Sequence, residues 1–149
     1  DEIEVEEREK VLELFGENSS VTSYFQDITD NMYKKVFLDK ESSNIQVLRN
    51  DGETLSANKL SGGTFDQLYL SIRIALGEKL LKDEKGFFIT DDPFIKSDSK
   101  RLKNQISMLK KIVDYGWQIL FFTAKEEVIN VFRDDIRENR INYIKLNQL

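Results

Sequence analysis

Two short polar segments of this chain have the residue types needed to bind a phosphate group and a metal ion. The first is the run Ser61-Gly62-Gly63, which comes directly before a strongly periodic helical segment. Glycines leave backbone amides uncovered, the serine hydroxyl adds a donor, and a helix N-terminus carries partial positive charge, so this turn suits a phosphate. The alternative is that Ser61 only caps the helix and that the glycines only form the turn.

The second segment is the pair Asp91 and Asp92, followed by Pro93, at the end of the apolar run 87–90. Open parallel sheets bind ligands at the carboxyl ends of their strands, and carboxylates are suitable ligands for magnesium. Adjacent residues of an extended chain point to opposite faces, so one carboxylate can hold magnesium while the other orients or deprotonates a water. The alternative is an acidic strand end whose carboxylates are satisfied by nearby amides.

The periodicity of the apolar residues predicts the elements that position these segments. Helices are expected over residues 1–15, 21–37, 65–81, 98–114 and 126–138. Strands are expected over residues 45–49, near 54–55, and over 87–90, 119–123 and 141–146. We therefore expect an α/β fold with a mainly parallel sheet flanked by helices, and a small antiparallel element before the Ser-Gly-Gly turn.

Three local details accompany these elements. The strands over 87–90 and 119–123 are expected to be buried, because both are almost entirely apolar. Gly77 lies inside a predicted helix, where glycine costs about 1 kcal/mol relative to alanine, which predicts a close packing contact at this position. The helix over 98–114 is expected to be capped by Ser97 or Asp98.

Composition limits the classes of protein that remain. The formal charge of the 149 residues is -5, and residues 1–10 hold six acids against two bases, so no basic nucleic-acid surface dominates the rest. Histidine and cysteine are absent, which excludes histidine triads, histidine metal sites and disulfides. No apolar run is long enough to span a bilayer and no signal peptide is evident, which favours a cytoplasmic protein.

The two segments, in this order and at this spacing, resemble the C-terminal lobe of an ABC-class ATPase head of the SMC, SbcC and DNA double-strand-break-repair type. The resemblance rests on Leu60-Ser61-Gly62-Gly63, Asp91-Asp92-Pro93 and Asp98. The run Leu-Ser-Gly-Gly-Thr-Phe-Asp-Gln-Leu-Tyr-Leu, with Asp-Asp-Pro-Phe, is most similar to the bacterial YhaN-like branch. The resemblance implies half of a P-loop NTPase head, with ATP and Mg²⁺ as cofactors.

The resemblance also implies a role for each matching residue. The signature motif, which in this family contacts the γ-phosphate of ATP held by the opposite protomer, is matched by Leu60, Ser61, Gly62, Gly63 and Thr64. Asp91 matches the Walker B magnesium ligand, Asp92 the catalytic carboxylate, and Asp98 the D-loop aspartate at the dimer interface. Arg73 matches an arginine that couples nucleotide state to lobe movement, with a solvated helix residue as the alternative.

The chain departs from the family pattern in three places. Asp92 is one methylene shorter than the usual glutamate, and the switch position, commonly histidine, falls on Ala124 or Lys125. No Gly-x-x-x-x-Gly-Lys-Ser/Thr motif is present, so the main phosphate loop is missing. We therefore interpret residues 1–18 as the end of a returning coiled-coil helix, with an ordinary solvated helix as the alternative. Residues 19–149 are interpreted as the C-terminal lobe.

The leading hypothesis is an ATPase that hydrolyses ATP at composite sites across a head dimer, in DNA repair or chromosome maintenance. This chain alone is expected to be inactive. Its expected partners are an N-terminal Walker A lobe of the same protein, a second head protomer and, through the full-length assembly, DNA, with no membrane indicated. The alternative hypothesis is a degenerate ATPase-like scaffold without hydrolysis, which the missing phosphate loop and switch histidine favour.

Overall fold

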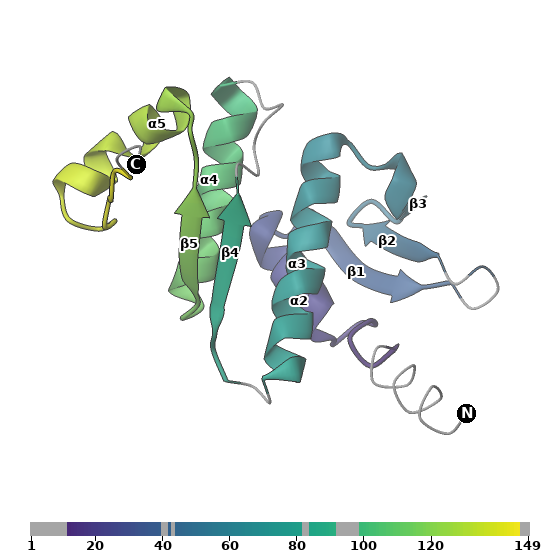
Figure 1. Ribbon diagram of the computed structural model, residues 1–149. Helices are drawn as coiled ribbons and strands as arrows, with labels where there is room; N and C mark the ends of the chain where they lie inside the picture. The colour runs from purple at the N-terminus through teal and green to yellow at the C-terminus, as the bar shows by residue number, and fades with distance from the viewer. Residues whose placement is uncertain (1–11, 40–41, 43, 82–83, 92–98, 147–149) are drawn as a thin grey trace.

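The computed structural model describes residues 12–39, 42, 44–81, 84–91 and 99–146 (Figure 1). Its elements follow in the order α2 (Ser20–Ile28), β1 (Tyr33–Leu38), β2 (Ile45–Arg49), β3 (Thr54–Ser56), a 3₁₀ turn (Ala57–Lys59), α3 (Gly62–Leu80), β4 (Phe87–Asp91), α4 (Ser99–Asp114), β5 (Gln118–Phe122) and α5 (Glu126–Arg137). The strands form a three-stranded sheet in the order β1-β2-β3 and a separate pair, β4-β5.

The fold is α/β, as expected, but its described strands are not mainly parallel. Both pairings of the first sheet are antiparallel, and only β4 and β5 run parallel to each other. The small antiparallel element predicted before the Ser-Gly-Gly turn is therefore confirmed. The expected parallel sheet is present in the described residues as a single pair of strands.

The prediction of one helix over residues 21–37 is wrong, because the chain turns after α2 and continues as strand β1. Asp30 and Asn31 have positive φ angles of 53° and 58°, which end the helix. A register shift between Tyr33 and Lys35 then lets Tyr33 and Val36, three residues apart, both be buried in the strand. This irregular strand therefore has the spacing of apolar residues that is typical of a helix.

The first hydrophobic cluster of the protein joins the antiparallel sheet to α2 and α3. Its buried side chains include Val21 and Phe25 of α2, Val36 and Val47 of the sheet, and Leu68 of α3. Burial of these side chains gives the sheet one covered face. It also fixes the end of β3 next to the start of α3, where the Ser-Gly-Gly turn lies (Figure 1).

The parallel strands β4 and β5 pack on α4 through one face only. The inward side chains Phe88, Ile119 and Phe121 join a second hydrophobic cluster, and the Phe88 ring stacks on Trp117 at a centroid distance of 4.7 Å. Side chains of the other face are exposed, in alternation along both strands. The positions of both strands are confirmed, whereas the expectation that both would be buried is wrong.

Helix α3 contacts both clusters, and its Gly77 provides the close approach that the sequence predicts. A Cβ atom on Gly77 would lie 2.8 Å from Cη2 of Trp117, closer than a real contact allows. Leu68 of this helix is buried, while Phe65, Tyr69 and Leu80 are exposed. The helix is thus packed along its inner side and leaves an apolar stripe outside.

We expect Gly77→Ala to destabilise the protein by about 1–2 kcal/mol, although alanine is the better helix former. The added methyl group must displace the Trp117 ring, and overpacking of this kind costs about 1–3 kcal/mol. The measurement is urea unfolding followed by circular dichroism. Gly63→Ala is the matched control in the same helix, because a Cβ there meets no atom within 4 Å. Equal stability of the two variants would show that the Trp117 contact does not constrain Gly77.

The C-terminal part of the chain is held by a buried carboxylate and not by a strand. Asp135 of α5, only 5% exposed, accepts hydrogen bonds from Lys110 Nζ at 2.6 Å and Arg140 Nε at 2.9 Å. Asn139 has a φ of 58°, and the Arg140 backbone N–H donates to the Asp135 carbonyl, so the chain folds back on the helix. The predicted strand over 141–146 is wrong, since this segment pairs with no described strand.

The free energy of unfolding should fall in acid, because Asp135 becomes protonated. The hydrogen bond from the Lys110 ammonium, aided by that from Arg140, lowers the pKa of Asp135 below its ordinary value despite burial. A lowered pKa gives stability that is present above the unfolded-state value near 4 and is lost as pH falls through the folded-state value. We therefore expect Asp135→Asn to be less stable than the wild type at pH 7. The difference in urea unfolding free energy should shrink below about pH 4; a constant difference would contradict this role.

Some predictions lie outside the described residues. These are most of the helix over 1–15 and the cap at Ser97 or Asp98. Within the described residues 12–18, Gly16 forms an isolated antiparallel bridge with Val36. In the described part of the chain, no helix has both the length and the apolar character needed to cross a membrane.

Candidate nucleotide site

The Ser-Gly-Gly turn opens α3, and Ser61 is the N-cap of that helix. Its Oγ accepts a hydrogen bond from the Thr64 backbone N–H at 3.3 Å and lies 2.9 Å from Thr64 Oγ1. The capping role considered from the sequence is therefore present. Leu60, directly before the cap, packs against the hydrophobic cluster of the antiparallel sheet and anchors the turn.

The two glycines of this turn are the first residues of the helix and are not needed to bend the chain. Neither Gly62 nor Gly63 has a positive φ, and a side chain at Gly63 would enter open space. The first amides of a helix have no intrahelical acceptor, so these N–H groups are available to an anion from outside. The view that the glycines only form the turn is not supported for Gly63.

The predicted metal ligand Asp91 is the last residue of β4 and is exposed. Within the described part of the chain, no amide or cation donates to its carboxylate. Asp92 and Asp98 lie outside the described residues. The residues that the structure describes contain no cluster of three acidic side chains that could hold a metal. One carboxylate at a strand end nevertheless fits a magnesium ion that takes its other ligands from phosphate and water.

The face of β4 and β5 that points away from α4 is called the uncovered face. Its members alternate with the buried ones and are paired in register between the strands: Phe87, Ile89, Asp91, Gln118, Leu120 and Phe122. Phe87 and Ile89 are 59% and 60% exposed, and Phe122 is 45% exposed. Figure 1 shows α4 behind the two strands, with no described element across their front. Parallel sheets are normally covered on both faces, so this apolar surface marks an interaction site.

The signature turn and Asp91 lie toward the same end of the molecule. Helix α3 runs away from its turn and β4 returns in the opposite direction, so the strand ends near the level where the helix begins (Figure 1). Because β4 and β5 are parallel, Asp91 also shares its edge of the sheet with residues 123–125. The turn, Asp91 and the switch position therefore lie toward one end of the molecule (Figure 1).

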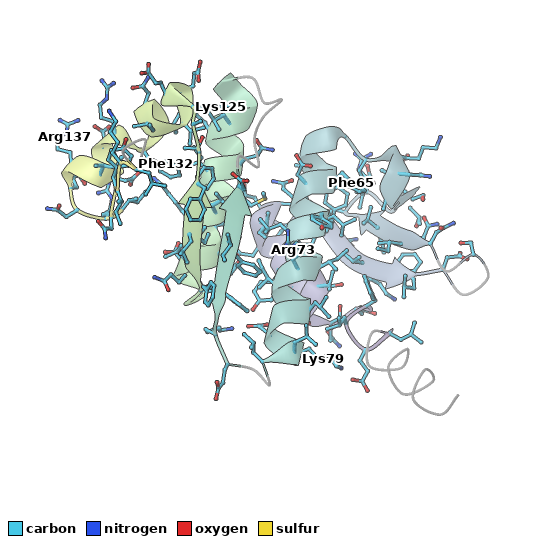
Figure 2. All side chains as sticks on the ribbon, in the orientation of Figure 1. Phe65, Arg73, Lys79, Lys125, Phe132 and Arg137 are labelled. Carbon is cyan, nitrogen blue, oxygen red and sulfur yellow. The ribbon has the colours of Figure 1, made fainter. Side chains whose placement is uncertain are left out.

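The switch position is occupied by a helix start. Lys125 is the N-cap residue of α5, makes no side-chain cap hydrogen bond, and its backbone N–H donates to Thr123 Oγ1 at 3.1 Å. Ala124 is exposed. Figure 2 shows Lys125 at the end of β5. The backbone here is thus fixed by Thr123, while neither Ala124 nor Lys125 supplies the neutral ring of histidine.

Arg73 does not lie at the signature turn. It is nine residues after Thr64 in α3, about 14 Å along the helix axis, and is exposed (Figure 2). Its guanidinium carbon lies 5.6 Å from the centroid of the Tyr69 ring, which is a cation–π contact within the exposed stripe of the helix. Arg73 is therefore placed for contact with a covering element and not with a phosphate at the turn.

Comparison with known proteins places this geometry in a class. The chain is 35% identical over 126 residues to the uncharacterized protein YhaN of Bacillus subtilis, covering 85% of this chain and 13% of that protein. It is 33% identical over 103 residues to the DNA double-strand break repair Rad50 ATPase of Saccharolobus solfataricus, covering 66% of this chain and 12% of that protein. No family model matches the chain.

Among solved structures, the SMC head domain from Thermotoga maritima resembles the chain with a TM-score of 0.51 and 18% identity, over 75% of this chain and 40% of that domain. This likeness supports the α/β fold of a P-loop ATPase head. The chain has the sequence and fold of the C-terminal region of an SMC/SbcC-like ATPase head. Within that class it is YhaN-like, and it spans about an eighth of the length of the curated relatives.

Proposed function

We propose that this chain is the C-terminal lobe of an ATPase head that binds and hydrolyses ATP with Mg²⁺ at composite sites across a head dimer. The observation that carries the proposal is the uncovered face, because a parallel pair of strands with Asp91 at its end is left half-covered. A second lobe that carries the phosphate loop would cover this face and place a nucleotide beside Asp91. The chain has no phosphate loop of its own, so the covering lobe must supply it.

In the proposed head dimer, the site residues of one chain contact two different ATP molecules. Asp91 holds the magnesium ion of the ATP on the covering lobe, and Asp92 orients the attacking water. The turn from Leu60 to Thr64 contacts the γ-phosphate of ATP on the opposite protomer through the amides at the start of α3. Asp98 lies at the dimer interface, and Arg73 couples nucleotide state to lobe movement. The open space beside Gly63 supports this use of the turn.

The biological setting is also a proposal. The names of the Rad50 relatives support DNA double-strand break repair, and chromosome maintenance is the alternative setting. DNA would then be contacted by the full-length assembly. The formal charge of -5 gives this chain no general basic surface for DNA.

The proposed covering of β4 and β5 is tested by Ile89→Glu. A charge at this 60% exposed position should leave the fold intact but weaken binding of the separately purified N-terminal lobe at least tenfold, about 1.4 kcal/mol, because the carboxylate would be buried without a partner. The measurement is titration calorimetry. Val113→Glu is the matched control, since Val113 is 51% exposed on α4. Equal affinity for the two variants would exclude the uncovered face as the lobe interface.

The second candidate function is a scaffold that dimerises without hydrolysis. Lys125 and Ala124 at the switch position favour it, because neither side chain can play the neutral hydrogen-bonding role of histidine. Steady-state kinetics of Lys125→Ala in the two-lobe head separates the possibilities for this position. A fall in turnover of about a hundredfold would show that Lys125 stabilises the transferred phosphoryl group, whereas little change would show that it is a solvated charge.

A further inference from the structure

A partly buried hydrogen bond joins the start of α3 to α4. Gln105 of α4, 7% exposed, donates from Nε2 to Oδ2 of Asp66 in α3 at 3.0 Å. Asp66 lies five residues after Ser61, in the second turn of the helix that the Ser-Gly-Gly turn opens. The bond therefore connects the N-terminal end of α3, which follows the Ser-Gly-Gly turn, to α4.

Because Gln105 is surrounded by buried apolar side chains, this hydrogen bond favours one relative position of α3 and α4. Its neighbours along α4, Leu102, Ile106 and Leu109, are buried in the second hydrophobic cluster. A buried amide that loses its acceptor costs about 1–3 kcal/mol, whereas apolar side chains tolerate small shifts between helices. Movement of the N-terminal part of α3 away from α4 is therefore opposed by this polar contact more than by the apolar packing around it.

The two ends of the bond belong to different parts of the proposed site. Helix α3 carries the turn Ser61–Thr64, while α4 is the next element after β4, whose last residue is Asp91. Near its other end, α3 is fixed by the contact of Gly77 with Trp117, which stacks on Phe88 of β4. Helix α3 is thus connected to α4 at one point and, through Trp117, to β4 at another.

We propose that Asp66 and Gln105 are positioning residues that hold the signature turn at a fixed place relative to the acidic end of β4. The functional consequence rests on the proposed function. In a head dimer, the turn serves the nucleotide of one site and Asp91 that of the other, so this hydrogen bond links the geometry of the two sites within one protomer. Loss of the bond should loosen the turn without unfolding the protein.

Hydrogen exchange of this chain tests the positioning itself. In Gln105→Met, which keeps the length of the side chain, we expect the amides of residues 64–68 to exchange about three- to tenfold faster, the range that corresponds to one lost hydrogen bond. Asp66→Leu removes the acceptor of the same hydrogen bond and should speed exchange of these amides to the same extent. Asp66→Asn retains an acceptor oxygen, so exchange in this variant should match the wild type. Gln67→Met is the matched control, because Gln67 donates to the Ile28 carbonyl of α2 and not to α4.

Wild-type exchange over residues 64–68 in both Gln105→Met and Asp66→Leu would overturn the inference. So would equally fast exchange in Gln67→Met, because the effect would then be general to the helix. ATP-dependent association of the two-lobe head gives the functional readout. Gln105→Met should weaken this association about tenfold. The separate variant Asp66→Asn, which keeps an acceptor oxygen, should associate within twofold of the wild type. A wild-type head that fails to associate with ATP would contradict the proposed function. The hydrogen-exchange result would then still decide whether Asp66 and Gln105 hold the turn in place.

Discussion

Replacing Ser61 with arginine is expected to abolish ATP-dependent association of two complete heads while each protomer remains folded. The arginine side chain would stand at the start of α3, where the amides of Gly62 and Gly63 are proposed to meet the γ-phosphate of the opposite nucleotide. Its bulk would prevent that approach, because a phosphate needs donors with no side chain in the way. We expect at least a hundredfold weaker association, about 2.7 kcal/mol, measured by light scattering with ATP and Mg²⁺.

Two further variants separate steric blocking from lost stability. Asn58→Arg adds the same charge at an exposed position three residues upstream and should leave association within about twofold of the wild type. Gly63→Ala should fold normally, since its Cβ meets no atom of this chain, but should weaken association because that space is proposed to hold the phosphate. An unchanged dimer fraction in Ser61→Arg would exclude the signature turn from the interface.

Asp92→Asn should produce a head that binds ATP and dimerises but does not separate again. The amide keeps the shape of the side chain and removes the negative oxygen that orients or deprotonates water. Turnover should fall by about a hundredfold or more, the usual contribution of a general base. Single-turnover hydrolysis and the lifetime of the ATP-bound dimer are the two measurements.

Asp91→Asn is the paired variant for this test. Its side chain lies on the uncovered face beside Phe122, and its proposed task is to hold magnesium. It should weaken Mg²⁺-dependent ATP binding and thereby prevent the dimer from forming. Identical defects in the two variants would show that the separate roles assigned to the adjacent aspartates are wrong.

Local sequence signals predicted most elements of this fold correctly. The three turn residues Asn50-Asp51-Gly52 lie between the strands predicted over 45–49 and near 54–55, and the structure has the β2-β3 hairpin there, in which Gly52 has a φ of 90°. Regular apolar spacing predicted the helices α3, α4 and α5 to within a few residues. The glycine at position 77 predicted a close contact, and the structure identifies Trp117 as its partner. The hairpin and the helices depend on short-range geometry, which local sequence patterns express directly.

The errors have physical causes that the sequence expresses weakly or not at all. Met32 and Val36, four residues apart, extended the helical pattern past α2, but Met32 is 58% exposed and Val36 lies in β1. The positive φ angles of Asp30 and Asn31 end the helix before both residues. The apolar character of β4 and β5 predicted burial on both faces, but the described elements α4 and α5 contribute side chains to one face only. The uncovered face is consistent with strands that are buried in a larger assembly.

For the candidate site, sequence motifs predicted the residues proposed to bind ligands, but they did not predict the contacts that hold those residues in place. Ser61 and Asp91 were found from their neighbours, and the structure places both toward one end of the molecule. The bond between Asp66 and Gln105 was missed, because the two residues are 39 positions apart and Gln105 lies in no motif, so nothing in the sequence pairs it with Asp66. Only the packing of α3 against α4 brings them together.

The most direct test of the central claim is phosphate release from ATP by the purified chain, before and after addition of the N-terminal lobe of the same protein. The chain alone has no phosphate loop to hold the nucleotide beside Asp91, so we expect no release above the uncatalysed background. Addition of the N-terminal lobe should produce turnover that depends on Mg²⁺ and is lost in Asp92→Asn. Robust release by the chain alone, or none by the two lobes together, would contradict a split ATPase head.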